Sequence, residues 1–274
     1  MMYVHDPGKM GNNVFLFMQF YAWAMENGRS IMSMRFAYKY QYFKLCDMPH
    51  NNMLWRLIGQ IGAKMGLIPT VRYDGVDADV EGNEKIIREN KNVMIRGWYV
   101  RYLPLVEKHI EEIREIFTFK ESISGKIARF MAENGGEGEN IGLHIRRRDY
   151  ARHMGGRFFF SDEEYAETMR QVVESGKRQN IYVCSDEPVD VEWWRKTLGT
   201  ERIYYLGGNP GEDMCLLSMC DKIVGTLSSF TLVAAMQRNL PIYWKRRKND
   251  RVSDEGFRPF SEMMYRFDSM FTEE

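Results

Sequence analysis

The second half of the chain alternates short apolar segments with polar segments of helical character. We expect strands at residues 140–146, 181–184, 203–206, 222–225 and 242–244. Helices are expected between them, and Ser161 with Glu164 three residues later fits a capping box at the start of the first one. Strands that alternate with helices predict an α/β fold whose C-terminal part is a doubly wound parallel sheet.

The first half predicts a separate α/β unit. Residues 1–35 indicate a strand, a glycine-containing loop, a buried helix and a second strand. The polar, acidic residues 72–92 are expected to form a surface loop, and residues 105–117 have helical spacing of apolar side chains. A glycine-rich turn at residues 135–138 then indicates a boundary. We expect domains of residues 1–135 and 136–274, with a last helix that could pack back on the first domain.

Composition and charge exclude several classes of protein. The 274 residues contain 38 Lys and Arg and 38 Asp and Glu, so the net charge is zero, which argues against a nucleic-acid-binding protein. The cysteines form no CxxC pair, which predicts buried, reduced thiols in a cytoplasmic protein. The five histidines have no metal-ligand spacing, so no metal site is expected. Residues 14–24 are apolar like a signal-peptide core but follow no basic region, which favours a buried helix.

Three consecutive arginines, Arg146, Arg147 and Arg148, follow the strand expected at residues 141–145. Three guanidinium groups repel each other unless an anion neutralises them, and arginine binds phosphate in a bidentate manner. Ligands of open α/β sheets bind at the carboxyl ends of strands. These residues therefore predict a phosphate or diphosphate site. A surface strand whose arginines pair with local acids explains the same residues equally well.

Two further polar segments end at equivalent strand edges. Ser185 and Asp186 follow one strand, and Ser228, Ser229 and Phe230 open a helix after another. A helix N-terminus with hydroxyl groups suits a phosphate, although serine at such a place is more often an ordinary N-cap. Because the three segments should meet at one edge of the sheet, together they indicate a nucleoside diphosphate site.

Asp213 lies at the start of an expected helix, where a carboxylate also favours the helix dipole. A carboxylate can instead accept both the N1 and the N2 hydrogens of guanine. Chemistry alone leaves these two roles open.

Several segments resemble a known family when they are taken in order. His144 to Tyr150 resembles the HxRRxD(Y) motif of the α-1,2-fucosyltransferases, which is shared in looser form by α-1,6- and protein O-fucosyltransferases. The remaining motifs also follow that family, from about residue 8 to residue 244: Gly11-Asn12-Asn13-Val14-Phe15, Gly97-Trp98-Tyr99, Val183-Cys184-Ser185-Asp186, and residues 213–220 followed by Ser228-Ser229-Phe230.

The resemblance implies a GT-B-type enzyme with two Rossmann-like domains facing across a cleft. It implies an inverting transfer without a metal and no cofactor beyond the donor substrate, GDP-fucose. The implied roles fall into three groups: a catalytic set of Arg146, Asp149 and Asn12; a donor-binding set of His144, Arg146, Arg147, Ser185, Asp186, Asp213, Ser228, Ser229 and Phe230; and an acceptor side of Asn13, Trp98 and Tyr99. Arg146 would hold the β-phosphate, His144 and Asp213 would recognise guanine, and Arg147 and Asp149 would orient the loop.

The chain departs from the family pattern at a few positions. Arg148 replaces a glycine, Asn13 replaces a glutamine, and Thr231-Leu232-Val233 replaces SWW. Asp77-Ala78-Asp79 mimics a metal-binding DxD, but no strand clearly delivers it. The basic residues 245–248 with Arg251 fit either anionic lipid or, more simply, a solvated loop.

The expected function is transfer of fucose from GDP-fucose to a glycan hydroxyl, with the 2-OH of galactose as the expected position. The expected setting is the synthesis of a surface polysaccharide, with a lipid-linked acceptor and peripheral contact with the inner face of the membrane. A glycosyltransferase that uses another GDP-sugar and a non-catalytic nucleotide- or carbohydrate-binding relative are the alternatives.

Overall fold

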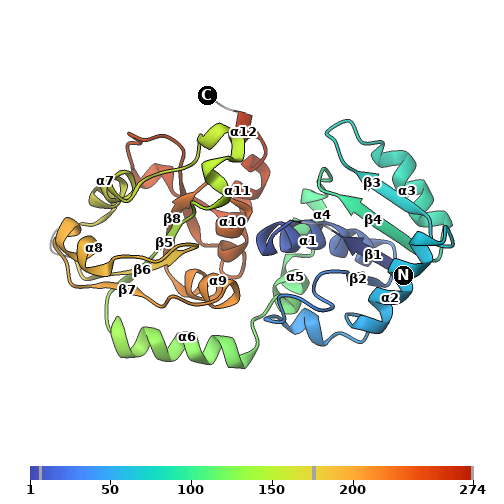
Figure 1. Cartoon of the computed structure of the whole chain (residues 1–274), viewed down its shortest axis with the longest axis horizontal. Helices are drawn as coiled ribbons and strands as arrows, with labels where there is room; N and C mark the ends of the chain where they lie inside the picture. Colours follow the sequence, from blue (N-terminus) through green and yellow to red (C-terminus); the bar gives the residue numbers. More distant parts are fainter. Residues whose placement is uncertain (6–7, 175–176, 273–274) are drawn as a thin grey trace. The chain divides into compact units, whose positions relative to one another are not determined.

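The computed structural model describes residues 1–5, 8–174 and 177–272, which form two compact units, Met1–Lys120 and Glu121–Glu274 (Figure 1). The boundary lies earlier than the one we expected between residues 135 and 136. Helix α6 (Glu121–Asn134) belongs to the second unit because it packs on α9 (Pro210–Met219), where Lys126 forms an ion pair with Glu212.

The first unit contains a four-stranded parallel sheet in the order β2-β1-β4-β3. Its strands are β1 (Met2–His5), β2 (Ile31–Ser33), β3 (Thr70–Tyr73) and β4 (Val93–Gly97). Its helices are α1 (Met10–Glu26), α2 (Met53–Lys64), α3 (Val80–Glu89), α4 (Leu103–Lys108), α5 (Ile110–Ile116) and the 3-10 turn η1 (Lys44–Asp47). The strand–loop–helix–strand start is confirmed.

Two expectations for the first unit are wrong in detail. The segment 72–92 is not a loop: it contains the end of β3 and the whole of α3. Asp79 begins that helix as its N-cap, accepting from the Gly82 N–H, so the DxD-like segment has a structural role. The helix expected over residues 105–117 is divided at His109 into α4 and α5.

Helices cover both faces of the first sheet. Phe20 of α1 contacts the ring of Tyr73 at 5.4 Å between centroids, whereas α2 packs on the side of Tyr3 and Met94. Since side chains alternate along a strand, these contacts lie on opposite faces. Helix α1 is apolar nearly all round and buried, as predicted, and its Gln19 accepts a hydrogen bond from the Tyr102 backbone.

The second unit contains a six-stranded sheet in the order β10-β9-β8-β5-β6-β7. The five predicted strands are present as β5 (Glu139–Ile145), β6 (Gln179–Ser185), β7 (Ile203–Tyr205), β8 (Lys222–Thr226) and β9 (Pro241–Lys245), all parallel. The short antiparallel β10 (Arg258–Pro259) was not predicted. Chain order runs outward from β5 in both directions, so a topological switch point lies between β5 and β8.

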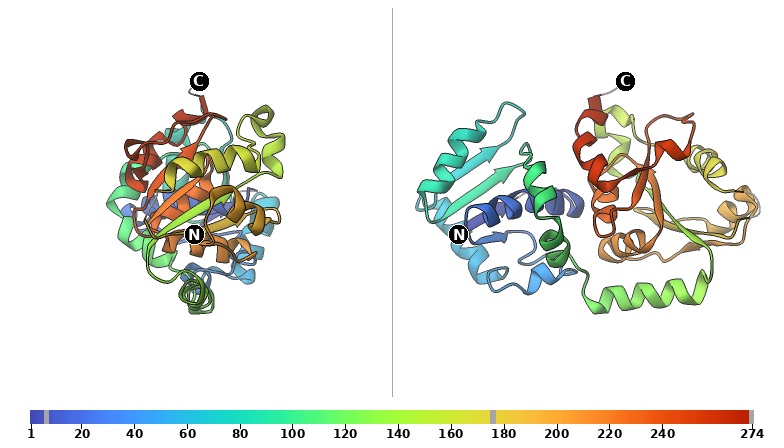
Figure 2. Two further views of the ribbon diagram at one scale, coloured as in Figure 1. Left: turned by 90° about the vertical axis from the view of Figure 1, so that its left-hand side faces the viewer. Right: turned by 180° about the vertical axis from the view of Figure 1, so that it is seen from behind.

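Helices also cover both faces of the second sheet. Figures 1 and 2 show α7 (Asp162–Val172) and α8 (Val191–Leu198) on one side, and α9, α10 (Ser229–Met236) and α11 (Phe260–Arg266) on the other. The predicted capping box of Ser161 and Glu164 begins α7. The last helices, α11 and α12 (Ser269–Thr272), fall within the second unit, where α11 packs on α10 and β9.

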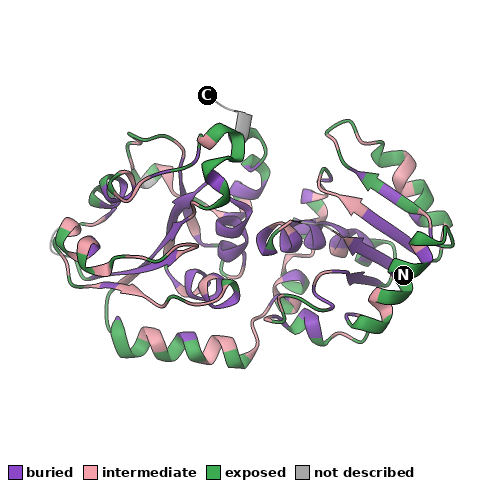
Figure 3. Cartoon of the chain, in the orientation of Figure 1, coloured by how far each residue is buried: buried purple, intermediate pink, exposed green. Residues whose placement is uncertain are grey.

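Burial follows the strands and the sheet-facing sides of the helices (Figure 3). All four cysteines, Cys46, Cys184, Cys215 and Cys220, are buried, as predicted. Within the described part of the chain, no helix is both long and apolar enough to cross a bilayer.

Candidate active site

The carboxyl ends of β5, β6 and β8 bring the three predicted polar segments together. His144 is paired in register with Gly225 of β8 and with Cys184 of β6, and Ile145 is paired with Ser185. The arginines therefore leave β5 at the switch point, beside the loop after β6 and the start of α10. The convergence predicted from the sequence is confirmed, and it occurs where ligands of doubly wound sheets bind.

His144 is buried and held by a hydroxyl group of α10. Its Nδ1 lies 2.7 Å from Thr231 Oγ1, and the Thr231 hydroxyl also contacts Ser228 Oγ at 3.1 Å and donates to the Thr226 carbonyl at 3.3 Å. A hydroxyl group has one proton and two lone pairs. A carbonyl oxygen can only accept, so all three contacts are hydrogen bonds together when Thr231 donates to Thr226 and accepts from Ser228 and His144. We therefore assign the proton of the imidazole to Nδ1, which leaves Nε2 as an acceptor.

The imidazole of His144 is neutral. Burial, reinforced by the charge of Arg146, lowers the pKa of His144 to about 3. Its ring stacks on Phe230, with centroids 4.9 Å apart and planes 28° from parallel. A neutral, stacked ring with a fixed tautomer presents a lone pair rather than a charge to a ligand.

Arg146 lies beside this pair and retains an unused donor. Its Nη2 donates to Asp149 at 2.9 Å, and its guanidinium lies 5.0 Å from the centroid of the Tyr150 ring. The Tyr150 hydroxyl in turn donates to the Leu227 carbonyl at 2.7 Å, which ties this loop to the approach to α10. The Nε of Arg146 is buried and has no hydrogen-bond partner among the described residues. An orphaned buried guanidinium nitrogen suits an anionic acceptor that the ligand would bring.

Arg147 is occupied by the protein instead. Its Nε donates to the Phe160 carbonyl at 3.0 Å, its Nη2 pairs with Asp162 at the start of α7, and its backbone N–H donates to Asp186 Oδ1 at 2.9 Å. The side chain of Ser185 accepts from the Glu187 N–H at 3.1 Å. Arg147, Ser185 and Asp186, which we predicted to bind the donor, therefore have contacts that order the loops around Arg146.

Ser228 is the N-cap of α10, where its Oγ accepts from the Thr231 N–H at 3.2 Å. Ser228 therefore has the ordinary N-cap role, and Ser229 and Phe230 follow it in the first turn of α10. First-turn N–H groups lack partners within a helix and carry the positive end of its dipole. The cap uses the Thr231 N–H, and the positive end of the α10 dipole lies at this same turn.

Asp213, for which the sequence left two roles open, lies in the first turn of α9. Its Oδ1 is buried and finds no protein partner in the described part of the chain. Burial, assisted by the charge of Glu212, raises the pKa of Asp213 to about 7. A carboxylate that merely balanced the helix dipole would have a lowered pKa. Asp213 therefore lacks hydrogen-bond donors that a ligand could supply.

The predicted acceptor-side residues all lie in the first unit. Asn13 is buried and its Nδ2 donates to the Gly8 and Lys9 carbonyls, both at 2.8 Å, so it shapes the loop before α1. Asn12, on the first turn of α1, is partly exposed. Trp98 packs on Phe15 with centroids 5.5 Å apart, and Tyr99 is 44% exposed.

Gly97 sets the path of this segment. Its φ is +103°, and a Cβ there would lie 2.3 Å from the Tyr73 carbonyl oxygen, which accepts from the N–H groups of both Trp98 and Tyr99 at 2.8 Å. The glycine of the Gly97-Trp98-Tyr99 motif is therefore required by a close backbone approach.

In the basic segment, Arg247, Lys248 and Arg251 are exposed, as expected of a solvated loop, whereas Lys245 is the last residue of β9 and differs from both expectations. Lys245 is fully buried, and its Nζ contacts the Thr168 hydroxyl at 2.9 Å and the Arg247 and Lys248 carbonyls at 2.9 and 3.0 Å. It contacts neither solvent nor lipid.

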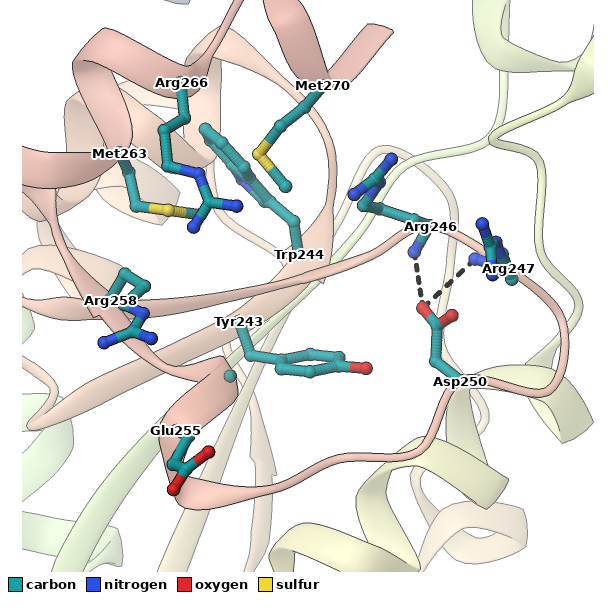
Figure 4. Close-up of a pocket in the computed structure, with 11 residues that line it drawn as sticks. Tyr243, Trp244, Arg246, Arg247, Asp250, Glu255, Arg258, Met263, Arg266 and Met270 are labelled. Carbon is teal, nitrogen blue, oxygen red and sulfur yellow. Dashed lines mark hydrogen bonds between the residues drawn. The ribbon is translucent and has the colours of Figure 1, made fainter. Parts of the chain in front are cut away.

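The neighbouring cavity has a volume of about 400 Å³ and is lined by Tyr243, Trp244 and Arg246 among others (Figure 4). None of the predicted donor residues lines it.

Sequence reasoning missed Thr231 as a functional residue. It appeared only as a departure from the family motif, although its hydroxyl follows Ser228 at the three-residue spacing of a helix turn. Its partner His144 lies 87 residues away in the chain, which no local pattern indicates.

The comparisons with solved structures define the fold class. A mutant of Arabidopsis thaliana FUT1 in complex with GDP matches with a TM-score of 0.61 and 13% identity, covering 94% of this chain and 73% of that one. POFUT1 in complex with GDP-fucose matches with a TM-score of 0.61 and 12% identity, covering 87% of this chain and 94% of that one. NodZ α-1,6-fucosyltransferase co-crystallised with GDP matches with a TM-score of 0.54 and 13% identity, covering 90% of this chain and 96% of that one. The chain has the GT-B-type fold that we expected.

The sequence comparisons place the chain more narrowly. Residues 97–240 match the profile of glycosyl transferase family 11. The galactoside 2-alpha-L-fucosyltransferase Sec1 of Mus musculus is 27% identical over 136 residues, which are 45% of this chain and 36% of the mouse protein. The matched segment thus spans about a third of that relative. The chain belongs to glycosyl transferase family 11, in agreement with the resemblance drawn from its motifs.

Proposed function

We propose that this protein transfers fucose from GDP-fucose to a hydroxyl group of a glycan, with inversion at the anomeric carbon. The observation that carries this proposal is a pair of buried polar atoms near the carboxyl ends of β5 and β6 that have no partner among the described residues. They are the Nε of Arg146, which follows β5, and the Oδ1 of Asp213 on α9, whose backbone carbonyl lies 3.5 Å from Cys184 Sγ of β6. GDP or GDP-fucose is bound in several solved relatives of the same fold, which supports the choice of donor.

The diphosphate would lie against Arg146 and the start of α10. The acceptor hydroxyl oxygen attacks the anomeric carbon while the bond from that carbon to the β-phosphate oxygen breaks; GDP leaves with the bonding electrons, and the hydroxyl proton is released to solvent. Negative charge grows on the diphosphate during this step. A guanidinium held by Asp149 and Tyr150 and a capped helix N-terminus are both in place before the charge develops, which is how electrostatic catalysis is arranged.

Guanine would satisfy the polar groups that the protein leaves without partners. An ionised Asp213 can accept the N1 and N2 hydrogens of guanine, which uracil and cytosine do not offer in that pattern. His144 Nε2 offers a further acceptor to the nucleoside, since Thr231 fixes the proton on Nδ1.

The acceptor is proposed to be a galactoside, fucosylated at its 2-OH. Support comes from the activity named for the mouse relative, which this chain matches over part of its length. Trp98 and Tyr99 are the residues of the first unit that we expect to affect acceptor affinity, whereas Asn12 belongs to the predicted catalytic set.

Calorimetric titration tests the donor site directly. GDP, UDP and CMP are titrated into the wild-type protein and into Arg146→Ala, with and without EDTA. We expect GDP-selective binding that survives EDTA and is strongly weakened in the variant. With GDP-fucose and galactosides, Arg146→Ala should lower kcat by about 10²–10³.

Two results would contradict the proposal. A preference for UDP, or binding that requires a divalent metal, would exclude a metal-free GDP-fucose site. GDP binding with no transfer to any of a panel of galactosides would leave a nucleotide-binding relative without the proposed activity.

A further inference from the structure

Helix α2 differs from an ordinary surface helix, in which the large apolar side chains face the core. It packs against the first sheet through Gly59 and Gly62, which are buried. A Cβ at these positions would lie 2.4 Å from the Tyr3 ring and 2.5 Å from Ile68 Cδ1. The glycines therefore allow α2 to approach Tyr3 and Ile68 closely, and the partly buried Trp55 and Ala63 of α2 pack on the same side.

The leucine, isoleucine and methionine residues of α2 are exposed instead (Figure 3). Leu54, Leu57, Ile58, Ile61 and Met65 recur at spacings of three and four residues, so they share one side of the helix. We call this set the α2 apolar face; its members are 42–67% exposed, and Leu67 just beyond the helix is 73% exposed. A contiguous apolar surface of this kind marks an interaction site on a folded protein.

The charged residues of α2 itself have one sign. Arg56, Gln60 and Lys64 lie four residues apart and form a polar stripe beside it. The sequence contains no Asp or Glu between Asp47 and Asp74. Arg56 also lies 4.5 Å from the centroid of the half-exposed Tyr38 ring, which adds an aromatic side chain to the basic border.

We propose that the α2 apolar face binds the surface of a membrane that contains anionic lipid. An interfacial helix has an apolar side that enters the boundary between headgroups and acyl chains and cations that contact anionic headgroups. A second copy of the chain fits less well, because a two-fold contact through this face would set Arg56 and Lys64 against the same cations of the partner. This surface is independent of the donor site.

Vesicle flotation tests the proposal with the full chain. Wild-type protein is mixed with vesicles of phosphatidylcholine alone or with phosphatidylglycerol added, at low and at high salt. We expect binding to the anionic vesicles that weakens with salt. Leu57→Gln/Ile61→Gln should reduce the partition coefficient by about tenfold or more, because two apolar side chains are lost from the interface. Lys64→Glu should reduce binding to anionic vesicles only.

The matched control is Val76→Gln/Val80→Gln, which makes the same kind of change at two exposed positions of the first unit outside α2. It should bind vesicles like the wild type, and circular dichroism should show that each variant is folded. No binding by the wild type, equal binding to both lipid compositions, or equal loss in the control overturns the proposal. A wild-type dimer that Leu57→Gln/Ile61→Gln dissociates, with no vesicle binding, would assign the face to a second copy of the chain.

Discussion

Replacing Thr231 by valine should disturb the donor site through His144 without changing the shape of α10. Valine is close to threonine in volume, so the packing of the helix is kept while one hydroxyl is lost. That hydroxyl is the acceptor for His144 Nδ1 and contacts Ser228 Oγ and the Thr226 carbonyl. The variant therefore removes the group that fixes the tautomer of a buried imidazole.

The size of the effect follows from burial. A buried donor left without an acceptor costs about 1–3 kcal/mol, and each lost neutral hydrogen bond contributes about 0.5–1.5 kcal/mol. Because Ser228 can rotate its hydroxyl, we expect a loss of about 2 kcal/mol in the free energy of unfolding. The freed imidazole can then hold its proton on Nε2, which replaces the acceptor facing the ligand by a donor. Loss of that contact should weaken GDP binding by about tenfold.

Three measurements check this reasoning. Denaturant unfolding gives the stability, calorimetry gives the affinity for GDP, and nitrogen NMR of labelled histidine reports which nitrogen of His144 carries the proton. Because the pKa of His144 is lowered to about 3, its signals should not titrate between pH 5 and 8. Thr231→Ser retains a hydroxyl and should restore both the tautomer and most of the affinity.

One result would refute the assignment of the proton. If wild-type His144 is protonated on Nε2, or if Thr231→Val binds GDP with wild-type affinity, Thr231 does not position the imidazole for the ligand. A loss of stability alone, without a change in tautomer or affinity, would reduce Thr231 to a structural residue.

Three further predictions concern other parts of the molecule. In the folded protein the pKa of Asp213 is raised to about 7. Its protonated form therefore stabilises the free protein fully below about pH 4, and this stability is lost as the pH rises through 7. The melting temperature of Asp213→Asn should depend less on pH between about 4 and 7. GDP affinity, which needs the ionised carboxylate, should rise with pH to a plateau above 7 in the wild type only. Arg147→Ala should lower the free energy of unfolding by about 1–3 kcal/mol, since it leaves the Phe160 carbonyl and the partly exposed Asp162 carboxylate without this partner, and its effect on kcat should be smaller than that of Arg146→Ala. Gly97→Ala should cost at least about 2 kcal/mol in stability, because φ is +103° and the new Cβ meets the Tyr73 carbonyl; an unchanged melting curve would contradict the close approach.

The sequence determined the architecture of the second unit and the place of its site. Alternating strands and helices predicted a doubly wound sheet, and the polar residues at three strand ends had to meet at one edge because parallel strands share a direction. The motif around Arg146 could therefore be located before any contact was known. These features are local or periodic patterns of residues, which can be recognised in a sequence without knowledge of the tertiary contacts.

Other features depended on the packing of distant segments. Only the structure shows that Arg147 turns to Asp162 while Arg146 keeps a buried nitrogen without a protein partner, since neighbouring arginines have the same local pattern. The structure also groups α6 with the second unit, because the domain boundary depends on which helices touch rather than on a glycine-rich turn.

Helix α2 shows most clearly the difference between what the sequence determines and what the tertiary structure decides. Its periodicity fits an amphipathic helix, and from sequence alone the leucines and isoleucines would be assigned to the core. The tertiary structure reverses this orientation, because Gly59 and Gly62 lie so close to Tyr3 and Ile68 that no Cβ fits at these two positions. Sequence thus determined that α2 has an apolar side, whereas steric packing against the sheet decided that this side faces outward.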